Sequence, residues 1–282
     1  MLKPTKANPG ADYSEVTEVP GLRTTREAVS MLYTRYAVAA QFCEGKRVLK
    51  VGCGAGLGLG HLAQRARSVV GGDYTESVLR YAQRSYPGQV PLVQLDAKRL
   101  PFANASFDVV ILFEAIYYLD QPQFFLQECR RVLGDAGFLL LSSVNKEWSG
   151  FNPSPLSRRY FSASELRKLL AENGFEVEIF GGFRASPDTA SRKAIEVVRR
   201  LAIRLHLIPR TMRGKEFLKR LFYGRLVTVP TKVQVGMARL EPLVPLLDAQ
   251  TVQCYMVLYA LARVRTGVSS WSEATRSVST LA

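Results

Sequence analysis

Apolar residues along the chain alternate between short continuous runs and segments with helical spacing. Short apolar runs predict buried strands, and apolar residues three or four positions apart predict the helices between them. The predicted strands cover residues 47–51, 68–73, 90–96, 107–115, 137–144 and 175–183, and the predicted helices cover 25–42, 58–66, 76–86, 121–133 and 162–174. Uniformly apolar strands that alternate with helices are typical of a parallel sheet covered on both faces. The pattern therefore predicts an α/β, doubly wound fold.

Residues at the ends of these elements support the assignment. Thr24 or Thr25 is suited to cap the first helix, because a threonine hydroxyl accepts hydrogen bonds from free backbone N–H groups. Gly134 and Gly174 follow the last two helices, and glycine is the preferred residue at a helix C-terminus. The segment 252–264, VQCYMVLYALARV, is rich in strand formers but also fits a buried helix. Periodicity leaves both readings open.

Positive charge is concentrated in one part of the chain. The 282 residues carry a formal net charge of +14, and residues 184–239 hold fourteen Lys or Arg against three acidic residues, a net of +11. The pattern there is mostly helical, with apolar residues on one face and arginines on the other. This pattern fits a solvated face, or attraction to an anionic substrate or membrane. We rank nucleic acid below these, since no aromatic stacking platform accompanies the charge.

Composition indicates the class of protein and its expected location. The hydrophobic share of 47% indicates a globular protein, and the longest apolar stretches fall short of the roughly 20 residues of a membrane span. The first residues lack the apolar core of a signal peptide. The four cysteines are scattered without a CxxC pair and there are two histidines, so we expect reduced thiols, no metal site and a cytoplasmic location.

A glycine-rich turn between a strand and a helix is the main candidate for chemistry. Residues 48–62 read VLKVGCGAGLGLGHL. Glycine allows a backbone to approach a ligand closely, and ligands bind at the carboxyl ends of strands in doubly wound sheets. The dinucleotide fingerprint GxGxxG fails from each possible start, and no GK[ST] follows for a phosphate-binding P-loop. The turn therefore lacks both phosphate-binding signatures.

The run VGCGAG after an apolar strand resembles motif I of the class I S-adenosylmethionine-dependent methyltransferases, in particular the type 11 group. The resemblance continues through VVGGDYTESVL and VQLDAKRLPF, each at the end of a predicted strand, and through LPFANASFDVV, which leads into the fourth strand. It covers about residues 30–180 and the last strand. It implies a Rossmann-like, seven-stranded, mostly parallel sheet in which 252–264 is a strand that lies antiparallel beside the sixth. It also implies S-adenosyl-L-methionine as the cofactor.

The resemblance assigns roles to particular residues. Asp73 would accept hydrogen bonds from the ribose hydroxyls, Tyr74 would lie against adenine, and Asp96 would bind the adenine amino group. The implied cofactor-binding residues are Lys50, Gly52, Cys53, Gly54, Ala55, Gly56, Asp73, Tyr74, Asp96, Ala97 and Glu114. Glu114, Tyr117 and Tyr118 occupy the stretch that faces the methyl group in relatives, and they are the candidate catalytic residues. Relatives often have a histidine near this stretch, and this chain has none there.

Lys50 departs from the family pattern, which has Asp or Glu at this position to favour the ammonium of the cofactor. Two positive charges about 5 Å apart repel by roughly 3 kcal/mol at an effective dielectric near 20, which would weaken binding roughly a hundredfold. A lysine side chain could instead extend away into water. On this account, Lys50→Glu should bind S-adenosylmethionine at least as tightly as the natural protein.

We expect a methyltransferase acting on a small-molecule, glycan or lipid-linked acceptor, with O- or C-methylation favoured over N-methylation. The alternative is a catalytically impaired cofactor-binding or scaffold protein on the same fold, because Lys50 replaces the usual acid. The expected organisation is a flexible lead-in (1–24), a cofactor-binding domain (25–181 with 251–265), a basic, largely helical substrate cap (182–250) and a disordered tail (266–282). Residues 184–240 are the expected contact with the inner face of an anionic membrane.

Overall fold

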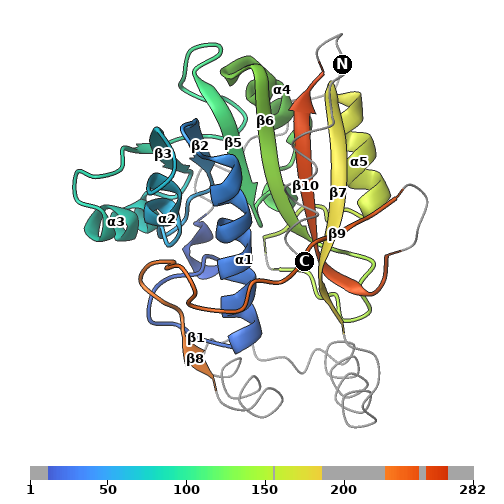
Figure 1. Ribbon diagram of the computed structural model, residues 1–282, viewed down its shortest axis with the longest axis horizontal. Helices are drawn as coiled ribbons and strands as arrows, with labels where there is room; N and C mark the ends of the chain where they lie inside the picture. The colour runs from blue at the N-terminus through green and yellow to red at the C-terminus, as the bar shows by residue number, and fades with distance from the viewer. Residues whose placement is uncertain (1–11, 155, 186–225, 248–251, 266–282) are drawn as a thin grey trace.

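The structure is a twisted sheet with helices on both faces (Figure 1). The computed structural model describes residues 12–154, 156–185, 226–247 and 252–265. Its main sheet has eight strands in the order β4-β3-β2-β5-β6-β10-β7-β9. Their bounds are β2 Arg47–Val51, β3 Ser68–Asp73, β4 Leu92–Gln94, β5 Phe107–Phe113, β6 Leu133–Val144, β7 Phe175–Arg184, β9 Val244–Pro245 and β10 Tyr255–Val264.

Strand directions confirm a mostly parallel sheet. Strands β4, β3, β2, β5 and β6 are joined by parallel pairings, and β10 lies between β6 and β7, antiparallel to both. Segment 252–264 is therefore a strand rather than a helix. The two-residue β9 pairs antiparallel with β7 and adds an eighth strand to the expected seven. It is too short, and contains a proline, to leave a strand pattern in the sequence.

The helices divide the core into two layers. They are α1 Arg26–Phe42, α2 Leu59–Ala63, α3 Glu76–Ser85, α4 Pro122–Val132 and α5 Ala163–Glu172. Alternate residues of a strand face opposite sides of the sheet. Ile111 of β5 packs in the same cluster as Leu32 and Tyr36 of α1, whereas Leu112 packs in the cluster of α4 and α5. In Figure 1, α1 lies in front of the sheet and α4 and α5 lie behind it.

Helix ends agree with the expected caps in two of three places. The Thr25 hydroxyl accepts a hydrogen bond from the Ala28 amide at 3.0 Å, and Gly174 adopts a left-handed φ of +83° after α5. The expected cap at Gly134 is wrong, because α4 ends at Val132 and β6 begins directly at Leu133. Leu133 is buried and pairs with Phe107, so tertiary packing ends the helix before glycine is reached.

Residues 12–24 and 226–228 contribute a small sheet that is separate from the main one. Residues 12–24, which the sequence indicates as part of a mobile lead-in, form the 3-10 turn η1 (Tyr13–Glu15) and the strand β1 (Arg23–Thr24). Strand β1 pairs antiparallel with β8 (Val227–Thr228). The largely helical character expected for 182–250 depends mostly on residues 186–225, and these lie outside the described residues, as does the expected tail (266–282). Within the described ranges no helix is both long and apolar enough to cross a bilayer.

Candidate active site

A cavity of about 450 Å³ opens at the carboxyl ends of the parallel strands. Pockets that bind small molecules have volumes of about 300–1,000 Å³. The predicted site residues that line the cavity are Lys50, Gly52, Cys53, Gly54, Ala55, Asp73, Tyr74, Asp96, Ala97, Glu114, Tyr117 and Tyr118. Gly56 is the predicted residue that does not line it. A Cβ at Gly56 would lie 2.7 Å from Cβ of Ala82, so this glycine allows the turn to pack against α3.

The glycine turn lies beneath the N-terminal segment (residues 12–19). Gly54 has a φ of +54°, a conformation that L side chains rarely adopt, and a Cβ there would lie 2.9 Å from the Thr17 methyl carbon. The Thr17 hydroxyl donates to the Tyr13 carbonyl at 2.7 Å, and the Tyr13 amide donates to the Thr75 hydroxyl at 3.3 Å. Glycine at position 54 therefore lets the segment close over the turn.

Asp73 joins the turn to the end of β3. One carboxylate oxygen accepts a hydrogen bond from the Gly54 amide at 2.8 Å, and the other accepts from the Thr75 amide at 3.0 Å. Burial raises the pKa of Asp73, although these amide bonds act against the shift. A carboxylate oxygen can accept more than one hydrogen bond. Asp73 can therefore hold the turn and still accept bonds from a ligand in the cavity.

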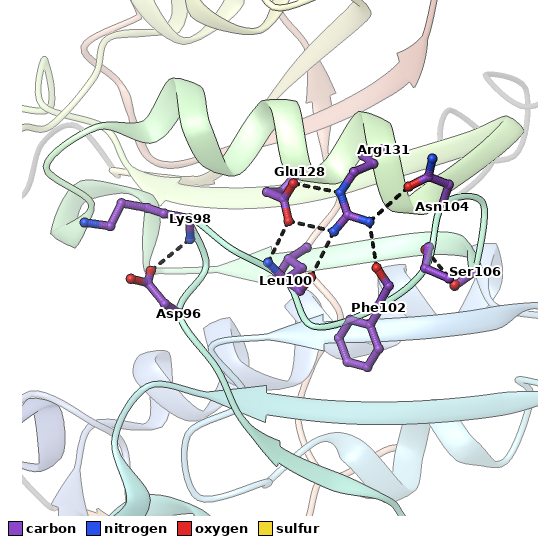
Figure 2. A network of polar contacts seen from close by, with 9 residues as sticks. Asp96, Lys98, Leu100, Phe102, Asn104, Ser106, Glu128 and Arg131 are labelled. Carbon is purple, nitrogen blue, oxygen red and sulfur yellow. Dashed lines mark hydrogen bonds and ion pairs between the residues drawn. The ribbon is translucent and has the colours of Figure 1, made fainter.

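Asp96 and Tyr74 lie at the end of the cavity next to β3 and β4. The Asp96 carboxylate accepts a hydrogen bond from the Lys98 amide at 2.9 Å (Figure 2). Tyr74 is 38% exposed and contacts the ring of Tyr13 edge-on, with centroids 6.2 Å apart. An acidic group beside an accessible aromatic ring can recognise a flat base that carries N–H donors.

The segment that follows Asp96 is fixed to α4 by one arginine (Figure 2). The Arg131 guanidinium donates to the carbonyls of Leu100 at 2.9 Å and Phe102 at 2.6 Å. It also pairs with Glu128 at 2.7 Å, and Glu128 accepts from the Leu100 amide at 2.7 Å. These contacts fix the conformation of the segment LPFANASFDVV, which connects β4 to β5. The sequence pattern did not indicate the role of Arg131.

Lys50 is 1% exposed, so its side chain does not extend into water. Its ammonium donates to the carbonyls of Val51 at 2.9 Å and Gly52 at 2.8 Å, and lies 5.2 Å from the centroid of the Phe113 ring. Burial lowers the pKa of Lys50 to about 8, while Cys53 and Asp73 act against this shift. Lys50 therefore closes the glycine turn through its carbonyl groups.

These contacts reverse the expectation for Lys50→Glu. A carboxylate cannot donate to the two carbonyls, and it would add a buried negative charge to a region that already holds Asp73 and Glu114. We now expect this variant to bind the cofactor more weakly and to lower the free energy of unfolding.

Glu114 lies directly after β5 and has a left-handed φ of +51°. Such a conformation in a residue other than glycine costs about 1–3 kcal/mol and is often found at functional sites. Its carboxylate accepts hydrogen bonds from the Ser142 hydroxyl at 3.0 Å and the Tyr117 hydroxyl at 3.3 Å. Burial raises the pKa of Glu114, and Arg35 acts against this shift. The position therefore suits a carboxylate that takes up a proton.

The two tyrosines are better suited as donors than as bases. Tyr117 stacks on Tyr160 with ring centroids 4.3 Å apart, and burial raises its pKa well above the usual range. Tyr118 shares a 2.8 Å hydrogen bond with the Ser154 hydroxyl, and burial raises its pKa to about 12. Both phenols are therefore protonated at neutral pH.

The N-terminal segment and α1 contribute site residues that the sequence pattern does not indicate. Arg35 is 7% exposed, lines the cavity, and its guanidinium donates to both carboxylate oxygens of Glu18 at 3.1 and 2.9 Å. Tyr13 contacts the Tyr118 ring with centroids 5.3 Å apart. The one available signal was an arginine in the middle of an otherwise apolar helical segment. A buried arginine needs a partner, and this one lies 17 positions earlier in the chain.

The residues present fit an adenosyl sulfonium group. Among the described residues that line the cavity, five carry carboxylates and four carry cations. The pairs Glu18–Arg35 and Asp120–Lys98 neutralise each other at 2.9 and 3.2 Å. Asp73, Asp96 and Glu114 then remain beside Lys50 and Arg158, so the carboxylates are in excess by one and favour a cationic ligand. Within the described ranges no cluster of His, Cys, Asp and Glu could hold a metal ion.

Comparison with known proteins gives the same family. A family model described as a methyltransferase domain matches residues 49–141. A probable S-adenosylmethionine-dependent methyltransferase from Mycolicibacterium smegmatis is 37% identical over 57% of this chain and 63% of its own length. An O-methyltransferase from Aspergillus sclerotiorum is 30% identical over 65% of this chain and 81% of its own. A fatty-acid O-methyltransferase from M. smegmatis is 30% identical over 54% and 56%.

Solved structures agree on the fold. A methyltransferase from Thermotoga maritima, described as a possible histamine N-methyltransferase, superposes with a TM-score of 0.53 at 16% identity, over 84% of this chain and 92% of that one. The chain spans 52–63% of the length of three curated mycobacterial relatives that it matches. The O-methyltransferase from A. sclerotiorum is covered over more than two thirds of its length. The chain therefore belongs to the S-adenosylmethionine-dependent methyltransferase family.

Proposed function

We propose that the protein transfers a methyl group from S-adenosylmethionine to an oxygen atom of a small or lipid-like acceptor, with Glu114 as the general base. The observation that carries the proposal is the Glu114 carboxylate at the edge of the cavity, held by Ser142 and Tyr117. Relatives named as O-methyltransferases, one of them acting on fatty acids, support an oxygen acceptor.

When bound, S-adenosylmethionine supplies an electrophilic methyl group on a sulfonium. The glycine turn and Asp73 would hold the ribose and methionine portions, and Asp96 with Tyr74 would hold the adenine. The task left to the protein is to align the acceptor and to exclude water. The N-terminal segment and the rings of Tyr13 and Tyr118 serve the second purpose, because they form part of the cavity wall and the two rings are in contact.

An oxygen nucleophile usually gives up its proton to a base during transfer. Glu114 is suited to this role because burial raises its pKa, which makes the ionised carboxylate a stronger base. Tyr117 donates to the same carboxylate and so fixes its direction. Tyr118 lines the cavity with its hydroxyl held by Ser154, and this hydroxyl can orient a polar acceptor.

The test is methyl transfer from radiolabelled S-adenosylmethionine to a panel of phenols, aliphatic alcohols, fatty acids and amines. We expect transfer to an oxygen acceptor, and Glu114→Gln should lower kcat by about 10²–10⁴. Its affinity for S-adenosylhomocysteine should stay within about threefold, because the lost group acts on the acceptor. Glu172→Gln is the matched control, since it changes an exposed carboxylate on α5.

Transfer confined to amines, or full activity in Glu114→Gln, would contradict the proposal. Binding of S-adenosylhomocysteine without transfer to any member of the panel would favour the alternative, a cofactor-binding or scaffold protein on this fold.

Contact of residues 184–240 with an anionic membrane is a separate part of the proposal and is supported by their net positive charge. Vesicles of phosphatidylglycerol should co-sediment the protein at low salt, and vesicles of phosphatidylcholine should not. Added salt should release it, because screening shortens electrostatic range to about 3 Å at 1 M. Failure to co-sediment at low salt would exclude the membrane contact.

A further inference from the structure

Lys50 is a buried cation that forms no ion pair with any residue that the structure describes. Its side chain is 1% exposed, and no carboxylate of the described residues lies within ion-pair distance of its ammonium. The other buried cation of the cavity, Arg35, is paired with Glu18. A buried charge is costly unless it is paired and hydrogen-bonded. The positive charge of Lys50 on the cavity wall is therefore not balanced by an ion pair with a described residue.

The ammonium also has donor capacity left. An ammonium carries three N–H donors, and two are used on the carbonyls of Val51 and Gly52. Lys50 lines the cavity, and the carbonyls that it binds belong to the turn at the cavity's base. No described residue accepts a hydrogen bond from the third donor, and Lys50 lies where the glycine turn meets the cavity.

We propose that Lys50 binds the carboxylate of the methionyl group of the cofactor. This inference rests on the proposed binding of S-adenosylmethionine in this cavity. The methionyl end carries one ammonium and one carboxylate, and a buried ammonium attracts the carboxylate and repels the ammonium. The methionyl end is accordingly bound with its carboxylate towards β2.

The charged groups around Lys50 are consistent with this assignment. Arg35 adds a second positive charge from α1, whereas Asp73 and Glu114 add negative charge from the ends of β3 and β5. Burial lowers the pKa of Lys50 to about 8, so it is mostly protonated at neutral pH. A bound carboxylate would supply the ion-pair partner that none of the described residues provides.

Titration calorimetry with three ligands tests the inference directly. The ligands are S-adenosylhomocysteine, its analogue without the carboxylate, and its analogue without the amino group. The natural protein should bind S-adenosylhomocysteine about tenfold or more tightly than the decarboxylated analogue, as expected for a charge-assisted hydrogen bond. A ratio near one in the natural protein overturns the inference without any variant.

Two variants separate charge from turn closure. Lys50→Gln keeps amide donors for the two carbonyls but has no charge, whereas Lys50→Met has neither. In Lys50→Gln the carboxylate preference should fall to about threefold or less, while the preference for the amino group is kept. Lys46→Gln, an exposed lysine just before β2, is the matched control and should keep both preferences.

The outcomes distinguish this inference from the proposed function. Lys50→Gln could bind S-adenosylhomocysteine tightly and keep the same carboxylate preference as the natural protein. That result would overturn this inference but not the cofactor site, and Lys50 would then only hold the glycine turn through its carbonyl groups. Absence of S-adenosylhomocysteine binding by the natural protein overturns the cofactor site itself, and this inference with it. Thermal unfolding of each variant identifies losses that come from misfolding.

Discussion

Arg35 in α1 donates from one guanidinium nitrogen to both carboxylate oxygens of Glu18, at 3.1 and 2.9 Å. Arg35 is nearly fully buried, whereas the Glu18 side chain is 44% exposed at the rim of the cavity. This pair fastens the N-terminal segment to the body of the domain. It therefore couples the closure of the cavity to the stability of the fold.

Glu18→Gln should lower the free energy of unfolding by about 1–2 kcal/mol, because it leaves a buried guanidinium without its counter-charge and Glu18 is only partly buried. Urea unfolding measures this change. Glu44→Gln is the matched control, since it breaks the exposed Arg65–Glu44 pair and should cost less than about 0.5 kcal/mol. Equal losses in the two variants would show that the Arg35 pair has no special role.

Gly54→Ala should weaken S-adenosylhomocysteine binding by about tenfold or more, because the new Cβ meets the Thr17 methyl at 2.9 Å and the backbone keeps a positive φ. Gly45→Ala carries the same backbone strain at a φ of +66° with no atom within 4 Å. Gly45→Ala should lower the free energy of unfolding but leave the affinity for S-adenosylhomocysteine unchanged. Calorimetric titration and thermal unfolding of both variants separate strain from contact.

The double variant Gly54→Ala with Thr17→Ser tests the contact itself. Serine lacks the methyl that the new Cβ would meet, and it keeps the hydroxyl that donates to Tyr13. Part of the lost affinity should therefore return. If it does not, the N-terminal segment does not limit the space above the turn.

Arg131→Gln should destabilise the segment between β4 and β5 and weaken cofactor binding through Asp96. The variant loses donors to the Leu100 and Phe102 carbonyls and the ion pair with Glu128, so we expect a loss of about 1–3 kcal/mol in the free energy of unfolding. Arg130→Gln changes the exposed neighbour on the same helix and is the control. Hydrogen exchange should increase in residues 98–106 of Arg131→Gln alone.

Much of the fold could be predicted because its signals are local. The apolar runs of β2, β3 and β5 and the Thr25 cap of α1 lie where the sequence places them. The start of β6 could not be located, since Gly134 is a good helix terminator locally and only the pairing of Leu133 with Phe107 overrides it. Strand β9 exists because β7 offers an edge, and its two residues carry no pattern of their own.

The candidate site divides in a similar way. Residues that follow strands, such as Asp73, Asp96 and Glu114, converge because the carboxyl ends of parallel strands share one edge. Arg35 and Glu18 could not be paired from sequence, since their contact depends on how the N-terminal segment folds over the turn. The direction of the Lys50 side chain also depends on packing. Its burial follows from Phe113 and the turn carbonyls, which no spacing rule indicates.

The free energy of unfolding should depend on pH through Glu114. Burial raises the pKa of this carboxyl above its usual value of 4.5, so the native state holds the proton to higher pH than the unfolded state. The stabilisation from the protonated form is complete below about pH 4.5 and is lost as pH rises through the raised pKa. Glu114→Gln has no such titration. Relative to Glu114→Gln, the natural protein should therefore become less stable as the pH rises from 4 to 8 in urea unfolding. A difference between the two proteins that stays constant across this range would mean that Glu114 is not perturbed by burial, and its role as a strengthened base would lose its support.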